Sequence, residues 1–482
     1  MVQKYIIYLE KDVVVVLNNI KSCRIVCIKP YFVCEIVRSS ILFCNFTPQK
    51  HKGMKKNLTY TLLIIAAFTT ALSSCIRDKF KYYGYEDQLE GTFPVDQIDG
   101  SHTWLLTSVT NTFIKGNVNN AHKLLILSGN PFDESDVEIL AESFTSSVIS
   151  KNMTYLAPSH ISSVYVAVLD RYGNYISLTK GKIGGEIDLV NTLPTGTPKA
   201  VVPQKLVYGF EANYPNPGDW DYNDLVLSLT KELTGETTVD VHVTLHAVGW
   251  IGTSFTPAQI GAAIRWVGSR YALVKDQVER NPKSTFMNAP EQPRKYFPGE
   301  WTDFQRSLND EFVINLFDDA HLAIYKLGED GSVYRRYFNT VVDPSSTSAK
   351  QPAKTVTYTF TFDSEFEARN FTLAELDPFI MVQYGTDGDH FWEIHSFTYK
   401  LEEVLYKYYN GAAQSYNNGF SWAVVVPYSQ YRYPVEEEAI GMYKNTIISG
   451  AYQEKEHSFG EWILDRTKAR DWYLYPADGG VY

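Results

Sequence analysis

The sequence contains few cysteines, and none of them lies in the C-terminal four fifths of the chain. Four of its five cysteines lie within residues 1–53 and the fifth is Cys75, so residues 76–482 contain none. A chain of 482 residues buries enough apolar surface to fold without disulfides. Cysteine nucleophiles, thiolate metal sites and a disulfide scaffold are therefore excluded for everything after Cys75.

The sequence also lacks an excess of positive charge. It holds 44 Lys and Arg against 55 Asp and Glu, and its formal net charge is −11. Binding of nucleic acid is disfavoured, because phosphate affinity rests on clustered Lys and Arg. No Gly-Lys-Ser/Thr phosphate loop and no Gly-x-Ser-x-Gly motif follows Cys75, which disfavours nucleotide chemistry and this class of serine nucleophile. With 44% hydrophobic residues, the composition is that of an ordinary globular protein.

Residues 54–74 have the order of a secretory signal peptide. A basic start, Met54-Lys55-Lys56, is followed by an apolar run, Leu58–Leu72, and then by Ser73-Ser74-Cys75. The apolar run is too short and too often interrupted by Thr to be a permanent membrane span. Leu-Ser-Ser-Cys resembles the bacterial lipobox, in which the Cys is acylated and begins the mature chain. A buried N-terminal helix with an incidental cysteine is the alternative.

We therefore expect a lipid on Cys75, a tether over residues 75–100, and attachment to the outer membrane through the lipid only. A signal peptide acts at a nascent N-terminus, yet residues 1–53 precede this one. We interpret Met54 as the true start of translation and residues 1–53 as a mis-called upstream segment. A genuine N-terminal extension is the alternative.

Beyond the tether the pattern predicts a mainly β protein with two β-sandwich-like modules. Residues 101–193 contain short apolar runs, and turn residues between Ser163–Leu169 and Tyr175–Leu178 indicate a hairpin. We expect a small sandwich there, with one helix over Glu134–Ser147, and a boundary at the Pro-rich stretch 193–198. Residues 200–482 form the larger module, with strands such as 354–362 and short helices near Pro257–Val267 and Glu436–Ile448.

The strongest candidate for a functional site is a cluster of acidic and amide side chains between residues 207 and 227. Glu211 is followed, after a Pro/Gly turn, by four oxygen-bearing side chains, Asp219, Asp221, Asn223 and Asp224. Carboxylates this close repel one another unless a cation compensates them, and clustered hard oxygens suit Ca²⁺. We therefore expect Ca²⁺ as a cofactor bound by these five residues.

Two other interpretations of the acidic segment remain open. Its opening matches half of an EF-hand loop, but Asp224 stands where that loop needs Gly and Thr230 where it needs Glu. The segment can instead be an Asx-turn network that caps backbone amides. It can also supply the acids of a polysaccharide hydrolase, as can Asp387–Glu393, if these segments converge in one cleft at catalytic spacing.

Several motifs resemble the LruC-type domain of Gram-negative lipoproteins and other envelope proteins, a family whose biochemical function is uncharacterised. The similar segments, which occur in family order, are Gly209-Phe210-Glu211, Gly218–Val226, Leu376–Ile380, Glu393–His395, Asn417–Pro427, Tyr431–Glu436 and Asp471–Pro476. The family's usual Phe-Glu-Asp ends in Ala212 here, which removes one candidate ligand. The resemblance implies a cell-envelope lipoprotein and names no activity.

We therefore expect a non-enzymatic lipoprotein of the cell envelope with a Ca²⁺-binding acidic loop. Its expected partners are glycans or proteins and not nucleic acid. The 34 tyrosines are the basis for expecting aromatic contacts with glycan. A hydrolase that uses the clustered carboxylates is the alternative function.

Overall fold

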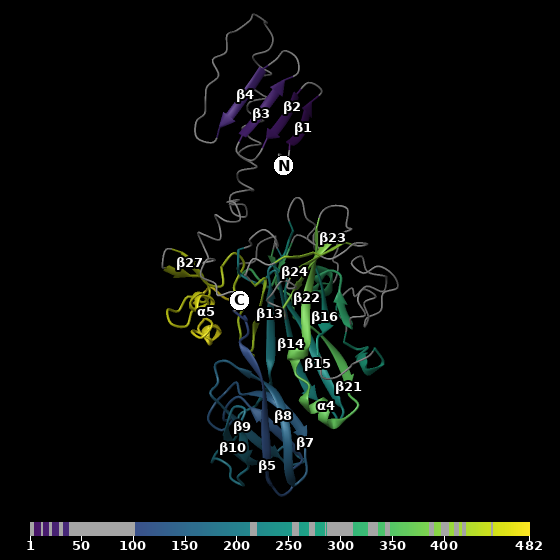
Figure 1. The fold of residues 1–482 in the computed structure, drawn as a ribbon, viewed down its shortest axis with the longest axis vertical. Helices are drawn as coiled ribbons and strands as arrows, with labels where there is room; N and C mark the ends of the chain where they lie inside the picture. Colours follow the sequence, from purple (N-terminus) through teal and green to yellow (C-terminus); the bar gives the residue numbers. More distant parts are fainter. Residues whose placement is uncertain are drawn as a thin grey trace, which may run out of the picture. The chain divides into compact units, whose positions relative to one another are not determined.

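The computed structural model divides the chain into two compact units, Met1–Tyr82 and Tyr83–Tyr482 (Figure 1). In the first unit it describes four strands, which pair as an antiparallel sheet in chain order: β1 (Lys4–Glu10), β2 (Val13–Asn18), β3 (Ser22–Cys27) and β4 (Phe32–Val37). In the second unit it describes residues 102–482 except 213–218, 253–259, 269–274, 285, 287–311, 326–335, 343–347, 385–389, 397–403, 409–413, 417–420 and 445–446. The predicted signal, Cys75 and the tether lie outside the described residues.

Residues 102–203 contain a small β-sandwich. One sheet has the order β10-β9-β6-β7-β12 and the other β11-β5-β8. Their bounds are β5 (Thr107–Asn117), β6 (Lys123–Leu127), β7 (Glu138–Phe144), β8 (Val148–Pro158), β9 (Ser163–Leu169), β10 (Tyr175–Lys182), β11 (Glu186–Asp188) and β12 (Val202–Pro203). A buried apolar cluster that includes Ile114, Ile126, Met153 and Val166 belongs to strands of both sheets. The β9–β10 hairpin expected from the sequence is confirmed.

A larger sandwich follows, built from two six-stranded sheets. Their orders are β17-β21-β15-β14-β13-β26 and β18-β16-β22-β23-β24-β25. The first comprises β13 (Lys205–Phe210), β14 (Leu225–Leu233), β15 (Thr238–Ala247), β17 (Val278–Arg280), β21 (Lys354–Thr361) and β26 (Ala423–Val426). The second comprises β16 (Ile260–Trp266), β18 (Val313–Phe317), β22 (Leu376–Tyr384), β23 (His390–His395), β24 (Val404–Tyr408) and β25 (Gln414–Tyr416).

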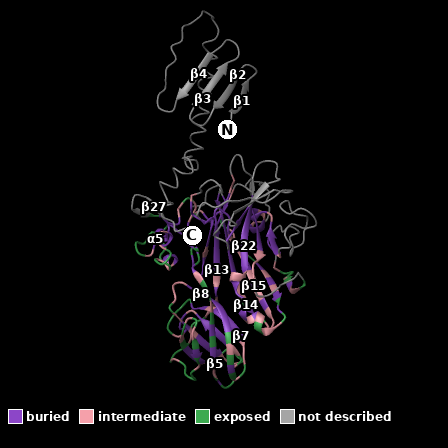
Figure 2. Ribbon diagram, viewed as in Figure 1, coloured by how far each residue is buried: buried purple, intermediate pink, exposed green. Residues whose placement is uncertain are grey.

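Burial along the strands follows the two-residue period of a sheet. In β15 every second residue is buried, which places its Val and Leu side chains on the core side. In the same sheet, every residue of β13 after Lys205 is buried, as are the first five residues of β14 (Figure 2). Two separate two-stranded sheets pair β19 (Tyr337–Phe338) with β20 (Ser348–Ala349), and β27 (Met442–Lys444) with β28 (Ile447–Ser449). The prediction of a mainly β protein is confirmed.

The helices are short and differ from those expected. In the described part of the chain they are α3 (Ala320–Ile324), α4 (Glu365–Asn370) and α5 (Phe459–Leu464), with 3-10 turns η2 (Lys275–Gln277), η4 (Leu373–Glu375) and η5 (Trp472–Leu474). The helices predicted at Glu134–Ser147, Pro257–Val267 and Glu436–Ile448 are wrong, because β7, β16 and the β27–β28 pair lie there. Ile260–Ile264 is fully buried within its sheet, so tertiary packing overrides the helix propensity of its alanines. None of the helices in the described part of the chain is long and apolar enough to cross a membrane.

The two sandwiches are joined by buried hydrogen bonds rather than by a free linker. The amide of Ser429 donates to Glu138, and the amide of Leu233 donates to Glu142. β12 follows the Pro-rich stretch yet pairs with β7 of the small sandwich. The C-terminal residues pack back on the large sandwich through aromatic contacts, among them that of Phe459 with Tyr222, whose ring centroids lie 6.2 Å apart.

Candidate functional site

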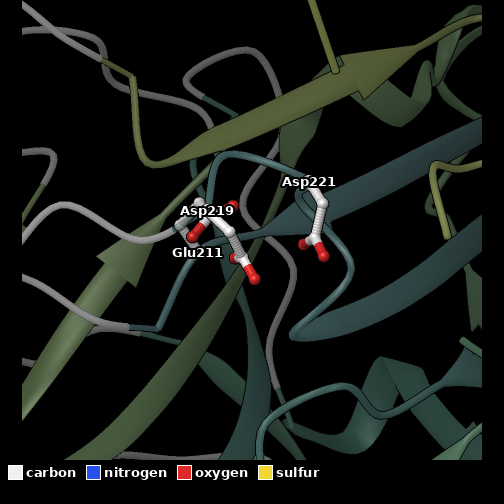
Figure 3. Close-up of side chains that lie close together, drawn as sticks. All are labelled: Glu211, Asp219 and Asp221. Carbon is white, nitrogen blue, oxygen red and sulfur yellow. The ribbon is translucent and has the colours of Figure 1, made fainter. Parts of the chain in front are cut away.

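Three carboxylates meet where β13 ends and the loop before β14 begins (Figure 3). One oxygen from each of Glu211, Asp219 and Asp221 lies within 4.8 Å of the others. Glu211 and Asp221 are buried and Asp219 is half-buried. The residues present therefore form an all-oxygen group of the kind that holds a hard metal ion.

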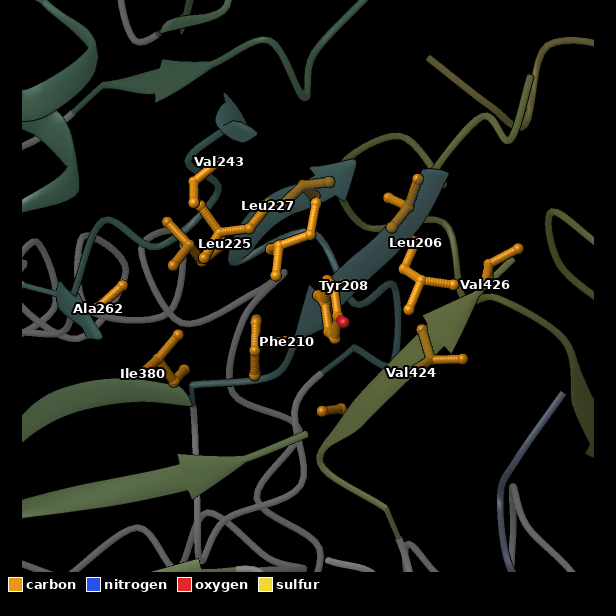
Figure 4. Packing of buried hydrophobic residues seen from close by; sticks show 14 of the residues in the cluster. Leu206, Tyr208, Phe210, Leu225, Leu227, Val243, Ala262, Ile380, Val424 and Val426 are labelled. Atoms are coloured by element: carbon orange, nitrogen blue, oxygen red, sulfur yellow. The ribbon is translucent and has the colours of Figure 1, made fainter. Parts of the chain in front are cut away.

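Glu211 is held in place by the core of the large sandwich. The preceding residue, Phe210, is buried in that core among side chains of both sheets, including Leu225, Ile380 and Val424 (Figure 4). Gly209 allows the loop to approach, because a Cβ at this position would lie 2.4 Å from the carbonyl oxygen of Tyr222. The Gly-Phe-Glu segment thus combines a close backbone contact, an apolar anchor and an acidic ligand.

The residues between the loop carboxylates anchor the loop. Trp220 packs against Trp422, with ring centroids 5.3 Å apart, and Tyr222 donates its hydroxyl hydrogen to the carbonyl of Ser421 at 2.8 Å. Both anchors adopt left-handed backbone angles, with φ of 61° at Trp220 and 52° at Tyr222. Such angles are costly for bulky residues and persist only where the surroundings enforce them.

Asp221 is the centre of a hydrogen-bond network. Its Oδ1 accepts from the amide of Asn223 at 3.0 Å, which is an Asx turn, and its Oδ2 accepts from Asn223 Nδ2 at 2.7 Å and from the amide of Glu437 at 3.0 Å. The turn network considered from the sequence is therefore present. It coexists with the carboxylate group, because hydrogen bonds leave lone pairs of Asp221 available.

The carboxylate of Glu211 accepts fewer hydrogen bonds than that of Asp221. Its Oε1 accepts from the amide of Tyr222 at 2.8 Å, whereas its Oε2 is buried and has no hydrogen-bond partner among the residues that the structure describes. Burial, and then the negative charges of Asp224 and Asp219, raise the pKa of Glu211 well above its usual range. Burial and the charges of Asp219 and Glu211 do the same to the pKa of Asp221. The group needs either protons or a cation at neutral pH.

The other two predicted ligands have different positions. Asp224 accepts the amide of Ala212 at 2.6 Å through Oδ2, so it ties the loop back to the end of β13. Asn223 donates Nδ2 to Asp221 and to the carbonyl of Pro434, which turns its Oδ1 away from Asp221. That oxygen is buried without a hydrogen-bond partner and lies 2.1 Å from where a Cβ of Gly249 would be.

Glu436 belongs to this acidic environment, although reasoning from the sequence did not select it. Its charge raises the pKa of both Glu211 and Asp221, and its Oε2 accepts from Thr340 Oγ1 at 3.2 Å. It lies beside the site because the amide of Ile440 donates to the carbonyl of Trp220 at 2.7 Å. The available signal was its place in the Tyr431–Glu436 segment, which carries a family resemblance but no charge pattern.

A second buried polar group lies on the other six-stranded sheet. Arg265, Asp377, Glu393 and His395 share one face, since Arg265 pairs with Asp377 across β16 and β22, and β23 lies alongside. His395 Nδ1 lies 2.7 Å from Asp377 Oδ2 and its Nε2 lies 3.2 Å from Glu393 Oε2, while Arg265 Nη2 contacts Asp377 Oδ2 at 2.8 Å.

Charge pairing in this group offsets burial. Burial lowers the pKa of His395, but the Asp377 and Glu393 carboxylates outweigh that effect and raise it overall. Burial raises the pKa of Asp377, but His395 and Arg265 lower it overall. Of the second acidic segment, Asp387 and Asp389 lie outside the described residues, and Glu393 is fully buried.

Residues 272–473 match the family model described as a domain of unknown function, DUF4842. The match covers Glu436, Asp377, Glu393 and His395 but begins after Arg265 and after the acidic loop. No curated protein matches the chain.

Proposed function

We propose that the acidic loop binds Ca²⁺ and that the protein is a non-enzymatic lipoprotein of the cell envelope. The observation that carries the calcium site is Glu211 Oε2, a buried carboxylate oxygen without a hydrogen-bond partner beside two further carboxylates. Within the described residues, neither Glu211 nor Asp221 forms an ion pair with Lys or Arg. A bound cation supplies the compensating charge that such a group requires.

The donor set favours Ca²⁺ over softer metals. Carboxylate, amide and backbone oxygens are its preferred ligands, and the group contains neither His nor Cys. Glu211, Asp219 and Asp221 are the first ligands in this proposal. Asn223 and Asp224 support them, since Asn223 orients Asp221 and Asp224 holds the end of β13. Ca²⁺ also tolerates the irregular geometry of a loop better than Mg²⁺ does.

The proposed role of the ion is to lock the C-terminal segment onto the large sandwich. Three hydrogen bonds join this segment to the acidic loop itself: Asn223 Nδ2 to the carbonyl of Pro434, Glu437 N to Asp221, and Ile440 N to the carbonyl of Trp220. Repulsion among the carboxylates opposes this docking. A cation removes the repulsion and stabilises the folded arrangement.

The cellular setting rests on sequence. The lipobox-like segment ending at Cys75 supports a lipid anchor at the outer membrane, and the resemblance to LruC-type envelope proteins agrees with it. We propose that the anchor is the sole membrane contact and that glycan or protein is the partner. The alternative, a polysaccharide hydrolase, is less favoured, because Glu393 is sequestered against His395 rather than open to a polymer.

Calorimetric titration with Ca²⁺, together with thermal melting in Ca²⁺ and in EDTA, tests the site. Glu211→Gln keeps the acceptor for Tyr222 and removes one charge, so it is the matched variant. We expect the wild type to melt at a higher temperature in Ca²⁺, because a Ca²⁺ concentration of a hundred times Kd adds about 2.7 kcal/mol to the free energy of unfolding. The Glu211→Gln variant should lose most of this gain. Affinity should fall in the weak extracellular range, about 10⁻⁴–10⁻³ M. Absence of both calcium heat and chelator sensitivity would leave a structural turn.

A further inference from the structure

A cavity of about 410 Å³ opens where the small sandwich meets the C-terminal part of the chain. Its walls come from the β6–β7 connection, the β8–β9 connection, β9 and β10 on one side, and from Tyr428 and Leu474 on the other. The volume lies in the range of small-molecule sites, about 300–1,000 Å³. None of the residues that line it belongs to the acidic loop.

One aromatic residue of the lining, Tyr428, packs against two further rings. The half-buried ring of Tyr428 lies 6.1 Å from the ring of His160 and 6.2 Å from that of Tyr473. His160 Nδ1 is hydrogen-bonded to the hydroxyl of Tyr473 at 2.8 Å, and Tyr473 is itself buried. Tyr428 is therefore positioned before any ligand arrives, which lowers the entropic cost of binding.

The opposite wall combines a second ring with charged groups. Tyr165 on β9 pairs with Lys180 on β10, and Lys180 Nζ lies 5.6 Å from the centre of the Tyr165 ring. Glu134 and Asp136 are exposed residues of the same lining, and Glu134 Oε1 accepts a hydrogen bond from the amide of Asn130 at 3.2 Å. The backbone of Asp136 is left-handed, with φ of 62°, a strained conformation of the kind that recurs at binding sites.

We propose that this cavity binds a neutral saccharide. A sugar ring has apolar C–H faces and hydroxyl edges, and the lining holds two tyrosine rings for the former and carboxylate acceptors with a Lys donor for the latter. Two carboxylates against one Lys give the lining no excess of positive charge, which disfavours anionic polymers. The inference gives a location to the glycan contact in the proposed function and does not depend on the calcium site.

The test is binding of the full-length protein to an array of immobilised neutral and acidic oligosaccharides and peptides, followed by calorimetry with the soluble form of any neutral oligosaccharide bound. Tyr428→Ala and Asp136→Asn should each weaken binding about tenfold or more, since each removes a direct contact. Tyr428→Phe, which keeps the ring, should bind like the wild type. Tyr172→Ala is the matched control, because Tyr172 is 73% exposed on the same sandwich and does not line the cavity.

Failure to bind any neutral oligosaccharide, or equal binding by Tyr428→Ala and the wild type, overturns the inference. Selective binding of peptides or acidic glycans that Tyr428→Ala abolishes also overturns it. Repeating the array in EDTA separates this result from the calcium proposal. Saccharide binding that requires Tyr428 but not Ca²⁺ supports the cavity even if the acidic loop binds no metal. The calcium response of Tyr428→Ala should equal that of the wild type.

Discussion

Asp221 accepts a hydrogen bond at 3.0 Å from the backbone amide of Glu437, which lies 216 residues further along the chain. The same carboxylate organises its own loop through the amide and side chain of Asn223. A single buried side chain therefore connects the acidic loop to the C-terminal segment. That connection makes the loop a structural junction as well as a candidate metal site.

Replacing Asp221 should disrupt both roles. Asp221→Ala leaves the amides of Asn223 and Glu437 without their acceptor, so we expect a loss of about 1–3 kcal/mol in the free energy of unfolding, even in EDTA. The difference in melting between Ca²⁺ and EDTA should also disappear. Denaturant unfolding in both buffers measures the two effects. A calcium response of wild-type size in this variant would place the ion elsewhere.

Without calcium, the acidic loop should make stability fall as pH rises. The folded pKa of Glu211 is raised above its unfolded value, so the folded state binds the proton more tightly. Its contribution is complete below the unfolded pKa of about 4.3 and is lost as pH rises through the folded pKa. Melting in EDTA from pH 5 to pH 8 should therefore decline more steeply in the wild type than in Glu211→Gln. Ca²⁺ should flatten the wild-type curve, and parallel curves in EDTA would count against the assignment.

His395 should contribute stability in its charged form. Its folded pKa is raised, so this contribution is complete below about pH 6.5 and is lost as pH rises through the folded pKa. His395→Ala leaves Asp377 and Glu393 buried without their shared partner and should cost about 3–5 kcal/mol at pH 6.

His457 provides the control for this prediction. It also pairs with a carboxylate, Asp471, at 3.0 Å, but its side chain is 36% exposed. His457→Ala should therefore cost about 0–1 kcal/mol. Denaturant unfolding at pH 6 and pH 8 compares the two variants. Equal losses would show that the buried network carries no special charge pairing.

Glu138 should make the junction between the sandwiches sensitive to pH. Burial raises its pKa to about 7, although the hydrogen bond from the Ser429 amide opposes the shift, and its Oε2 has no hydrogen-bond partner among the described residues. Stability from the protonated form is complete below the unfolded pKa of about 4.3 and is lost as pH rises through about 7, with a total on the order of 3 kcal/mol.

Glu138→Gln should remove this dependence and raise stability at pH 8, since the amide oxygen still accepts from Ser429. Hydrogen exchange of the Ser429 amide reports on the junction directly. In the wild type, exchange should accelerate between pH 5 and pH 8 beyond its intrinsic rise, and in Glu138→Gln it should follow the intrinsic rise. The same excess in both proteins would exclude Glu138 as the cause.

Processing at Cys75 is tested on the native N-terminus. Mass spectrometry should find an acylated Cys75 as the first residue, and Cys75→Ala should move the protein out of the membrane fraction. The Ile76 that follows, rather than an Asp, agrees with sorting to the outer membrane. Recovery of a mature peptide containing Cys23 or Cys44 would contradict cleavage at this position.

The sequence by itself determined the strands whose pattern is local. The hairpin at Ser163–Leu169 and Tyr175–Leu178 and the alternating strand at residues 354–361 were predictable, because side chains of a half-buried strand alternate between two faces. The predicted helices at Glu134–Ser147 and Pro257–Val267 failed for the opposite reason. Segments such as Ile260–Ile264 are buried on both sides and show no alternation, so only the neighbouring strands decide their conformation.

Some residues of the candidate site were likewise recognisable from the sequence, whereas others became apparent only in the fold. Glu211, Asp219 and Asp221 were recognisable from the sequence, because carboxylates concentrated near one turn are unusual without a compensating charge. Only the tertiary structure shows that Asn223 donates a hydrogen bond to Asp221 and that Asp224 accepts one from the amide of Ala212. It also shows that Glu436 lies beside the three carboxylates. Glu436 lies more than two hundred residues away in the chain and approaches through backbone hydrogen bonds from the C-terminal segment. Contacts made by docking of distant segments leave no local periodicity, and so no pattern in the sequence could have shown them.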